Sequence, residues 1–577
     1  MQTESWFIYN PSLGLSQIKK IELSINENLE HALRQIDGRI LKEYDVEIDE
    51  IENLILQSQN ANDNNKKTLA PFKKLKQIYL SCNWSTVSSG LLETQDELEG
   101  FYIPSNDNLK HIEVGTFNNK RMLNKLVINN SKLQLDVGIF KGMPNLKEVD
   151  LQNNQIESIP IGLFTDVPDI ERLIMSKNKI NTIASKVFYG LPFLKEVDLS
   201  YNLLEDWNEE AFSYVNSMQY LNLSNNKLKH LTPSSFKKLN SLVILHLDSN
   251  YLENLDKTTF IGLPRLDFLG LNNNKLRNID TSTFDRLKVL RVLLLENNEM
   301  SDFGPEVFHN LGKLQLLRFE NNNICKLGLN VFHGFKSLTS LHLNKMNLEI
   351  LEDNWAYGLI SLRDLDLSNN KIKQLPPNAF QSIPTLARLN LSNNLLEKLD
   401  LWALNDVYRL KSLDLSNNLL KEVPTNRLHN LSSIDCLNLS NNSIKYVCQR
   451  SFLTFRGLRE LNLSNNGVEV IEPDSFVINR KLAAINLSQN RLSTTSWVKT
   501  IPLEELNMND NRLSKIDDLL ISGKSLKKLS VKGNDVAHID LAVFVHTPLV
   551  ELVYDADKFA PGDVAQISNI LKSKQVY

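Results

Sequence analysis

Histidine, cysteine and acidic side chains are the residues that could carry catalysis or hold a metal in this chain. The 10 histidines are dispersed, and none stands at metal-ligand spacing from a cysteine or another histidine. None of HExxH, GxGxxG, GxxxxGKS/T or GxSxG is present. Carboxylates such as Asp150 and Asp198 recur with a fixed period, which places them about 10 Å apart on a sheet. The sequence therefore predicts no enzyme, no cofactor and no metal site.

Two histidines and two cysteines allow weaker chemistry. His246 and His342 could titrate near about pH 6 and make binding depend on pH, but the sequence favours two ordinary surface histidines. The 4 cysteines include no CxxC pair. Cys436 and Cys448 are expected on different faces, which argues against a disulfide between them.

Composition describes a folded chain of 577 residues with 42% apolar and 23% charged side chains. The net charge of -4 argues against a protein that coats nucleic acid or anionic lipid. Every apolar run is far shorter than the roughly 18 residues of a membrane span. We therefore expect neither a nucleic-acid partner nor a membrane span.

One phrase, seen as VDLQNNQI, LNLSNNKL and LDLSNNKI, repeats through the chain. Its marker asparagine recurs every 24 residues, with Met346 as the one exception. The positions are Asn154, Asn178, Asn202, Asn226, Asn250, Asn274, Asn298, Asn322, Met346, Asn370, Asn394, Asn418, Asn442, Asn466 and Asn490. We call these residues the ladder positions.

A phenylalanine stands ten residues after most ladder positions. The unit LxxLxLxxNxLxxLxxxxFxxLxx resembles the 24-residue "typical" leucine-rich repeat of extracellular animal proteins, including Toll-like receptor ectodomains and insect immune and adhesion proteins. The resemblance implies an α/β fold: a curved solenoid, or horseshoe, with a parallel concave β-sheet and an irregular or short-helical convex side.

Each part of the repeat has a physical reason. Leucines that alternate with polar residues predict strands with one buried face, and these strands stack about 4.8 Å apart. An inward asparagine amide can donate to and accept from the backbone of adjacent turns, while stacked phenylalanines fill the convex side. No turn buries its apolar face alone, so stability is shared between neighbours.

One repeat loses two marks, because Met346 replaces the asparagine and Ala356 the phenylalanine. Two interpretations remain: a soft joint at residues 344–358, or a tolerated variant, which the sequence favours.

Three segments are predicted. Residues 1–47 form an N-terminal cap, 48–555 a solenoid of about 21 or 22 repeats, and 556–577 a C-terminal capping helix. The cap contains IKKIELSI as a strand and ENLEHALRQI as a short helix, and QSQNANDNNKKT reads as a polar loop. The cysteine-rich caps of extracellular relatives are not visible.

The sequence does not decide the cellular compartment. The first residues lack the basic start and apolar stretch of a secretory signal. Asn-x-Ser/Thr sequons favour export, although five are simply the NLS of the repeat. The possible N-glycosylation sites are Asn83, Asn129, Asn222, Asn390, Asn430, Asn438, Asn441, Asn462 and Asn486.

The side chains six and four residues before each ladder position should face the concave surface. In the middle repeats this face becomes apolar with a charged rim, as protein interfaces do. The predicted partner-binding residues are Ile244, His246, Phe268, Val292, Leu294, Leu316, Arg318 and His342. Asp248, Glu296 and Glu320 are expected in the rim, and Phe268 is the candidate hot spot. Alternatively, these side chains only stabilise the sheet.

We therefore predict non-catalytic recognition of a protein ligand on the concave face, outside the cell, and the resemblance implies a role in innate immunity. A self-associating adhesion protein or scaffold, with a homo- or heterodimer through the same strip, is one alternative. A cytosolic leucine-rich-repeat scaffold is the other.

Overall fold

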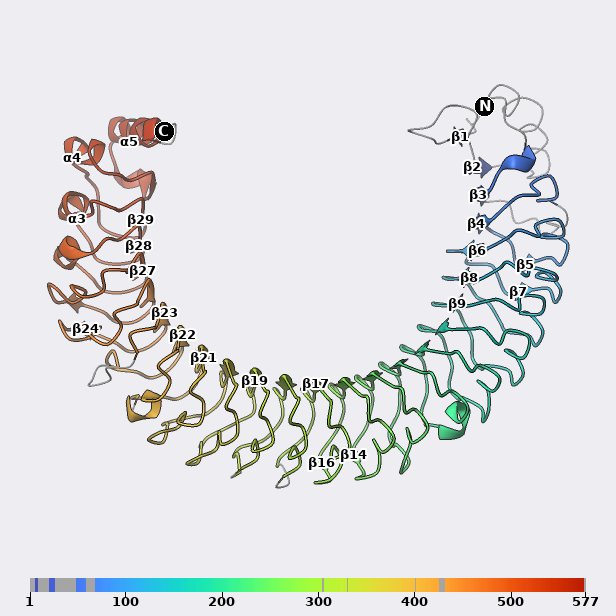
Figure 1. Cartoon of the computed structure of the whole chain (residues 1–577). Helices are drawn as coiled ribbons and strands as arrows, with labels where there is room; N and C mark the ends of the chain where they lie inside the picture. The colour runs from blue at the N-terminus through green and yellow to red at the C-terminus, as the bar shows by residue number, and fades with distance from the viewer. Residues whose placement is uncertain are drawn as a thin grey trace. The chain divides into compact units, whose positions relative to one another are not determined.

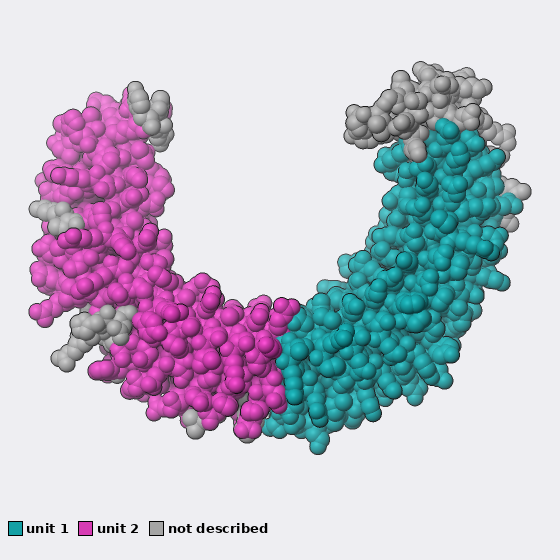
Figure 2. All heavy atoms as spheres, in the orientation of Figure 1, with its two compact units in different colours: residues 1–290 teal, residues 291–577 magenta. Residues whose placement is uncertain are grey.

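The computed structural model describes residues 6–8, 20–25, 48–58, 68–302, 306–328, 330–399, 401–424 and 431–574. The chain divides into two compact units, residues 1–290 and 291–577, which Figure 2 colours separately. In each unit the repeats place short parallel strands along one edge and loops along the other (Figure 1). Each unit is thus a solenoid of the predicted leucine-rich-repeat type.

Unit 1 contains one long sheet whose strands are parallel from β2 onward, with β1 antiparallel against β2. The main strands are β1 (Trp6–Ile8), β2 (Lys20–Ile25), β3 (Asn53–Ser58), β4 (Gln77–Cys82), β6 (Gly100–Ile103), β8 (Lys125–Ile128), β9 (Glu148–Asp150), β10 (Arg172–Ile174), β11 (Glu196–Asp198), β12 (Tyr220–Asn222), β13 (Ile244–His246) and β15 (Phe268–Gly270). The opposite side carries η3 (Ile48–Glu50), β5 (Thr86–Val87), β7 (His111–Ile112), η4 (Glu209–Phe212), β14 (Asn254–Leu255) and β16 (Asn278–Ile279).

Unit 2 repeats this arrangement with a parallel sheet from β17 to β30. Its main strands are β17 (Val292–Leu294), β18 (Leu316–Arg318), β19 (Ser340–His342), β20 (Asp364–Asp366), β21 (Arg388–Asn390), β22 (Ser412–Asp414), β23 (Cys436–Asn438), β25 (Glu460–Asn462), β27 (Ala484–Asn486), β28 (Glu505–Asn507), β29 (Lys528–Ser530) and β30 (Glu551–Val553). The other elements are η5 (Leu401–Leu404), β24 (Tyr446–Val447), β26 (Val470–Ile471), η6 (Ser496–Thr500), α3 (Asp517–Ser522), α4 (Leu541–Val545), η7 (Ala556–Lys558) and α5 (Pro561–Lys574).

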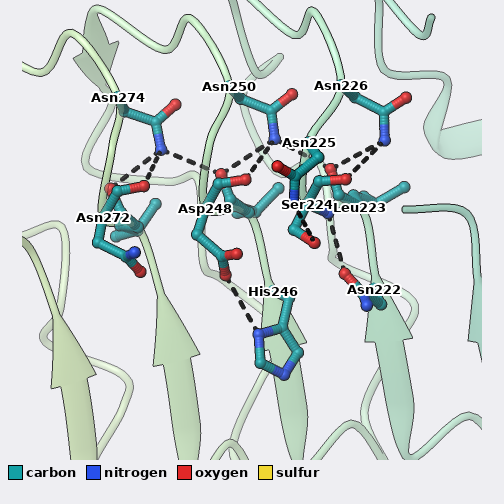
Figure 3. A network of polar contacts seen from close by, with 12 residues as sticks. Asn222, Leu223, Ser224, Asn225, Asn226, His246, Asp248, Asn250, Asn272 and Asn274 are labelled. Atoms are coloured by element: carbon teal, nitrogen blue, oxygen red, sulfur yellow. Dashed lines mark hydrogen bonds and ion pairs between the residues drawn. The ribbon is translucent and has the colours of Figure 1, made fainter. Parts of the chain in front are cut away.

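The ladder asparagines behave as predicted, and Asn250 shows the pattern (Figure 3). Its Nδ2 donates to the carbonyl of Leu247 at 3.1 Å and to that of Leu223, one turn earlier, at 2.9 Å. Its Oδ1 accepts the amide N–H of Leu228 at 3.0 Å. Each such side chain therefore ties two turns together and satisfies backbone groups that no water reaches.

The residue before each ladder asparagine explains why the repeat so often contains two asparagines. This position has a positive φ, for example 55° at Asn225 and 56° at Asn153. Asparagine accepts the left-handed region better than most residues that carry a Cβ. The first asparagine thus makes the turn, and the second makes the ladder.

The side opposite the strands is filled by aromatic rings. Phe236, Phe260 and Phe284 are each no more than 1% exposed and stack with ring centroids 6.1 and 6.0 Å apart. The buried leucines of the strands complete the core. Because this burial recurs in every turn, the 24-residue period is a packing requirement.

The turn of Met346 keeps its register, with β19 paired in parallel to both neighbouring strands. Met346 is fully buried, and Trp355 fills the aromatic place that Ala356 leaves. The Trp355 ring packs edge-on against Phe332 and Phe380 at 6.1 and 6.2 Å. Trp355, one position before Ala356, thus restores the aromatic core, although the repeat pattern does not predict it. The soft joint at residues 344–358 stays a hypothesis that amide exchange can test.

The two ends carry the elements that could close the solenoid. The IKKIELSI segment contains β2, whereas the predicted helix ENLEHALRQI and most of the loop QSQNANDNNKKT lie outside the described residues. At the other end, α5 buries Ile567, and Lys574 donates to the carbonyls of Phe544 and Thr547 at 3.0 and 2.8 Å. Among the described residues, no helix combines the length and apolar character needed to cross a membrane.

Candidate functional site

The inner face of each unit is defined as the side chains six and four residues before each ladder position. In unit 1 the structure brings Ile244, His246 and Phe268 together on the neighbouring strands β13 and β15. All three are half-buried, and the His246 and Phe268 ring centroids lie 4.7 Å apart. These predicted residues therefore form one compact group.

Tyr220 belongs to the same group, although the sequence strip began one strand later. It lies on β12 beside Ile244, and its ring centroid is 5.7 Å from that of His246. Burial raises the pKa of its phenol, and the charges of Asp198, Glu196 and Asp248 add to this. The signal that could have found it is its place in the same row, six residues before Asn226. We call Tyr220, His246 and Phe268 the aromatic cluster.

Asp248 holds the middle ring of the cluster in place. Its Oδ1 lies 3.1 Å from the Nδ1 of His246, a contact visible in Figure 3. A Cβ at Gly270 would approach this Oδ1 to 2.5 Å. Glycine on β15 thus makes room for the carboxylate, and the imidazole orientation is fixed before any partner arrives.

In unit 2 the remaining predicted residues lie on β17, β18 and β19. Val292 pairs with Leu316, and Leu294 pairs with Arg318, on adjacent strands. Val292, Leu294 and Leu316 are half-buried, and the backbone of Arg318 is paired with that of His342. The structure thus forms a second apolar group with a cation beside it.

The predicted rim needs one correction, because Glu296 and Glu320 are buried rather than exposed. They are 6% and 8% exposed. The Nε of Arg318 donates to Oε1 of Glu320 at 2.8 Å, and its Nη1 lies 3.9 Å from Oε1 of Glu296. The hydrogen bond to Glu320, with both carboxylate charges, raises the pKa of Arg318. A buried carboxylate requires a cationic partner of this kind. The prediction that these two glutamates lie in an exposed rim is therefore wrong.

The two histidines have separate surroundings. His342 in unit 2 places its Nε2 3.0 Å from the hydroxyl of Ser340, whereas His246 contacts Asp248 in unit 1. Within the described residues, no three His, Cys, Asp or Glu side chains gather as a metal site would require. Cys436 and Cys448 are both free thiols.

The sequon asparagines that the structure describes are all half-buried, whereas Asn430 lies outside the described residues. Five of them face the inner sheet, and each accepts the backbone N–H of its own sequon serine. These residues are Asn222, Asn390, Asn438, Asn462 and Asn486. This Asx hydrogen bond uses Oδ1, and a glycan would be built on Nδ2, which in Asn438 also donates to Oδ2 of Asp414 at 3.1 Å.

A hollow of about 520 Å³ lies on the inner face of unit 2 between β22 and β28. Small, amide and acidic side chains line it, among them Ser412, Cys436, Asn462, Ala484 and Glu460. Burial, followed by the nearby charge of Glu460, raises the pKa of the Cys436 thiol. This part of the face, which the sequence treated only as polar, is concave at the scale of a side chain.

These features define a leucine-rich-repeat recognition scaffold: a repeated frame that displays variable side chains on one sheet face. Sequence comparison places the chain in the leucine-rich-repeat family, to which it belongs. Overlapping matches cover residues 121–180, 144–204, 169–228, 193–252, 218–276, 241–300, 269–324, 289–348, 336–396, 384–444 and 436–492. This family indicates no enzymatic activity and generally supplies non-catalytic binding scaffolds. No curated protein sequence matches the chain.

Solved structures share the fold. The chain is 19% identical to Toll of Drosophila in the Toll–Spatzle complex, with a TM-score of 0.67. That match covers 87% of this chain and 65% of the Toll chain, so this chain spans about two thirds of its length.

Two further structures extend the comparison. TLR13 in its complex with ssRNA13 is 20% identical over 95% of this chain and 97% of its own, with a TM-score of 0.51. A leucine-rich-repeat protein of Leptospira interrogans is 23% identical over 75% and 95%, also with a TM-score of 0.51. At these identities the likeness establishes the fold.

Proposed function

We propose that this chain is an extracellular recognition module that binds a protein ligand on its inner faces. In unit 1 the binding residues are Ile244, His246 and Phe268, joined by Tyr220. In unit 2 they are Val292, Leu294, Leu316, Arg318 and His342. The aromatic cluster carries the proposal, because its rings lie outside the leucine core and contact one another around His246, which Asp248 holds.

The chemistry of the cluster supports a protein partner. Tyrosine is enriched among interface hot spots, and aromatic residues generally are enriched at interfaces, where half-buried rings with polar rims are common. The Toll structure contains the protein Spatzle, which supports the same partner class by analogy. The TLR13 structure contains RNA, but Glu196, Asp198 and Asp248 around the cluster would repel phosphate.

The first experiment compares three forms of the chain, secreted with glycans intact: wild type, Phe268→Glu and Ile161→Glu. Ile161 is 65% exposed away from the inner face and receives the same added charge as a matched control. We expect light scattering to give a monomer for all three, with the inner face available to a different protein. A wild-type dimer that only Phe268→Glu dissociates would replace the proposal with self-association through this face.

The ligand itself is tested by photo-crosslinking. A photoreactive phenylalanine analogue at position 268 should capture one protein from the extracellular fluid of the source tissue, and the same analogue at position 161 should not. Identical capture at both positions would contradict binding on the inner face.

Export is tested on the same material. Glycopeptide mass spectrometry should find glycans on sequons of the chain purified from its natural source. Glycans on any sequon would exclude the cytosolic scaffold. A chain in which no sequon carries a glycan would contradict export.

A further inference from the structure

The aromatic cluster sits in a strongly acidic surrounding. The inner-face positions of β12, β13 and β15 are Tyr220, Asn222, Ile244, His246, Phe268 and Gly270, which include no lysine or arginine. Asp198 on β11 and Asp248 beside Gly270 supply carboxylates at its two sides. Arg172, on β10, is already 3.0 Å from Glu196 and 3.6 Å from Glu148.

The carboxylates beside the rings have no cation of their own. In the described part of the chain, no lysine or arginine pairs with Asp198 or Asp248. The polar contacts they make are the N–H of Ser200 at 2.9 Å for Asp198 and the His246 ring for Asp248. Both sites thus keep acceptor capacity toward the inner face, within reach of rings that attract cations on their faces.

We infer that the aromatic cluster receives an arginine side chain of the partner protein. A guanidinium is planar, so it stacks on a ring while its N–H groups donate to carboxylates on either side. Tyr220 and Phe268 supply half-buried rings on either side of His246, and Asp198 and Asp248 supply the carboxylates. Lysine, a strongly hydrated point charge, fits this arrangement less well. The inference rests on the proposed function and adds the chemistry of the partner.

The test uses N-acetylarginine amide as the probe and N-acetylcitrulline amide as its neutral isostere, both followed by saturation-transfer NMR on the full chain. Arginine should give a signal about five-fold stronger than citrulline, the ratio that roughly 1 kcal/mol of cation–π and carboxylate attraction produces. The Asp198→Asn/Asp248→Asn variant should bring the two signals to the same level. Asp166→Asn, which removes an exposed carboxylate outside the inner face, should leave the arginine signal unchanged.

Two results would overturn the inference. One is equal signals from arginine and citrulline on the wild type; the other is an arginine preference that survives in the double variant. A third probe, N-acetylleucine amide, separates this failure from failure of the proposed function. A leucine signal that Phe268→Glu abolishes, without an arginine preference, rejects arginine and retains the binding face. No Phe268-dependent signal from any probe rejects both. Thermal unfolding of each variant verifies that the units stay folded.

Discussion

The inner faces at β12–β15 in unit 1 and at β22–β28 in unit 2 are built on the same frame but differ in shape and chemistry. In the first, three rings fill the surface and Asp248 fixes the middle one. In the second, small, amide and acidic side chains leave a hollow of about 520 Å³. The ladder beneath them hardly changes: Nδ2 of Asn250 and of Asn466 reach the carbonyl of the preceding turn at 2.9 and 3.0 Å. The frame thus fixes the positions of the inner-face side chains, whereas the residue type at each position varies from turn to turn.

The largest effect is expected from breaking the shared frame. Asn250→Ala and Asn466→Ala each leave one backbone amide without its acceptor. The two carbonyls one turn earlier and three residues before the asparagine lose this donor but keep one from a neighbouring ladder asparagine, so the cost should be about 2–3 kcal/mol of local stability. The loss should be smaller at Asn466, because it is half-buried and water can replace part of the bonding, whereas Asn250 is 4% exposed.

Amide hydrogen exchange at Leu228 and Ile444, the two N–H donors, measures this difference. Lys227→Ala, at an exposed side chain beside the ladder, should leave exchange unchanged. Protected amides in both alanine variants would show that the ladder does not hold the turns together.

A smaller change in stability should distinguish the inner face at β12–β15 from the inner face at β22–β28. Phe268→Ala removes a half-buried ring that packs on His246 and should lower the free energy of unfolding by about 1–2 kcal/mol. Ala484→Phe adds a ring where the hollow can receive it, so it should change stability by less than about 0.5 kcal/mol. Urea unfolding measures both. A large loss from Ala484→Phe would mean that the hollow closes in solution.

The turn of Met346, which lacks the ladder asparagine, could be made more stable by restoring it. Met346 supplies no acceptor for the N–H of the buried Ile324, the group that an asparagine Oδ1 accepts in regular turns. Met346→Asn should therefore stabilise this turn by about 1 kcal/mol and slow amide exchange at Ile324. Destabilisation would show instead that the core has adapted to the methionine side chain.

The smallest effect is expected from an aromatic pair on the neighbouring strands β4 and β6 of unit 1. Tyr79 and Tyr102 stack at 4.2 Å, and burial, then the nearby Tyr79 phenol, raises the pKa of Tyr102 to about 12. In the unfolded chain this phenol loses its proton near pH 10, whereas in the folded chain it does so at about pH 12. Its contribution to the free energy of unfolding is therefore complete below about pH 10 and is lost as the pH rises to about 12. Partial exposure limits the effect to about 1 kcal/mol.

Tyrosinate absorbance against pH should show a late-titrating phenol that Tyr102→Phe removes. Tyr408, which is 53% exposed, offers a matched Tyr408→Phe control. The same late phase in both variants would assign it to another tyrosine.

The sequence predicted the frame in detail because every frame residue is repeated. The period of 24 residues fixed the strands, and the asparagine amide had one chemically sensible place in each turn. The face was predicted less completely. Tyr220 lies one strand outside the predicted strip, although its ring continues the row of Ile244. Glu296 and Glu320 were expected in water because sequence pattern alone does not reveal that Arg318 covers them.

By itself, the sequence determined the family, the parallel strands, the ladder and the list of side chains on the inner face. These follow from local periodicity, since each turn buries the same groups against the next. Only the tertiary structure decided that Trp355 restores the aromatic core beside Ala356, that Gly270 makes room for Asp248, and that Tyr220, His246 and Phe268 become one cluster. Those outcomes depend on contacts between turns, where the size and charge of one side chain decide what its neighbour can do.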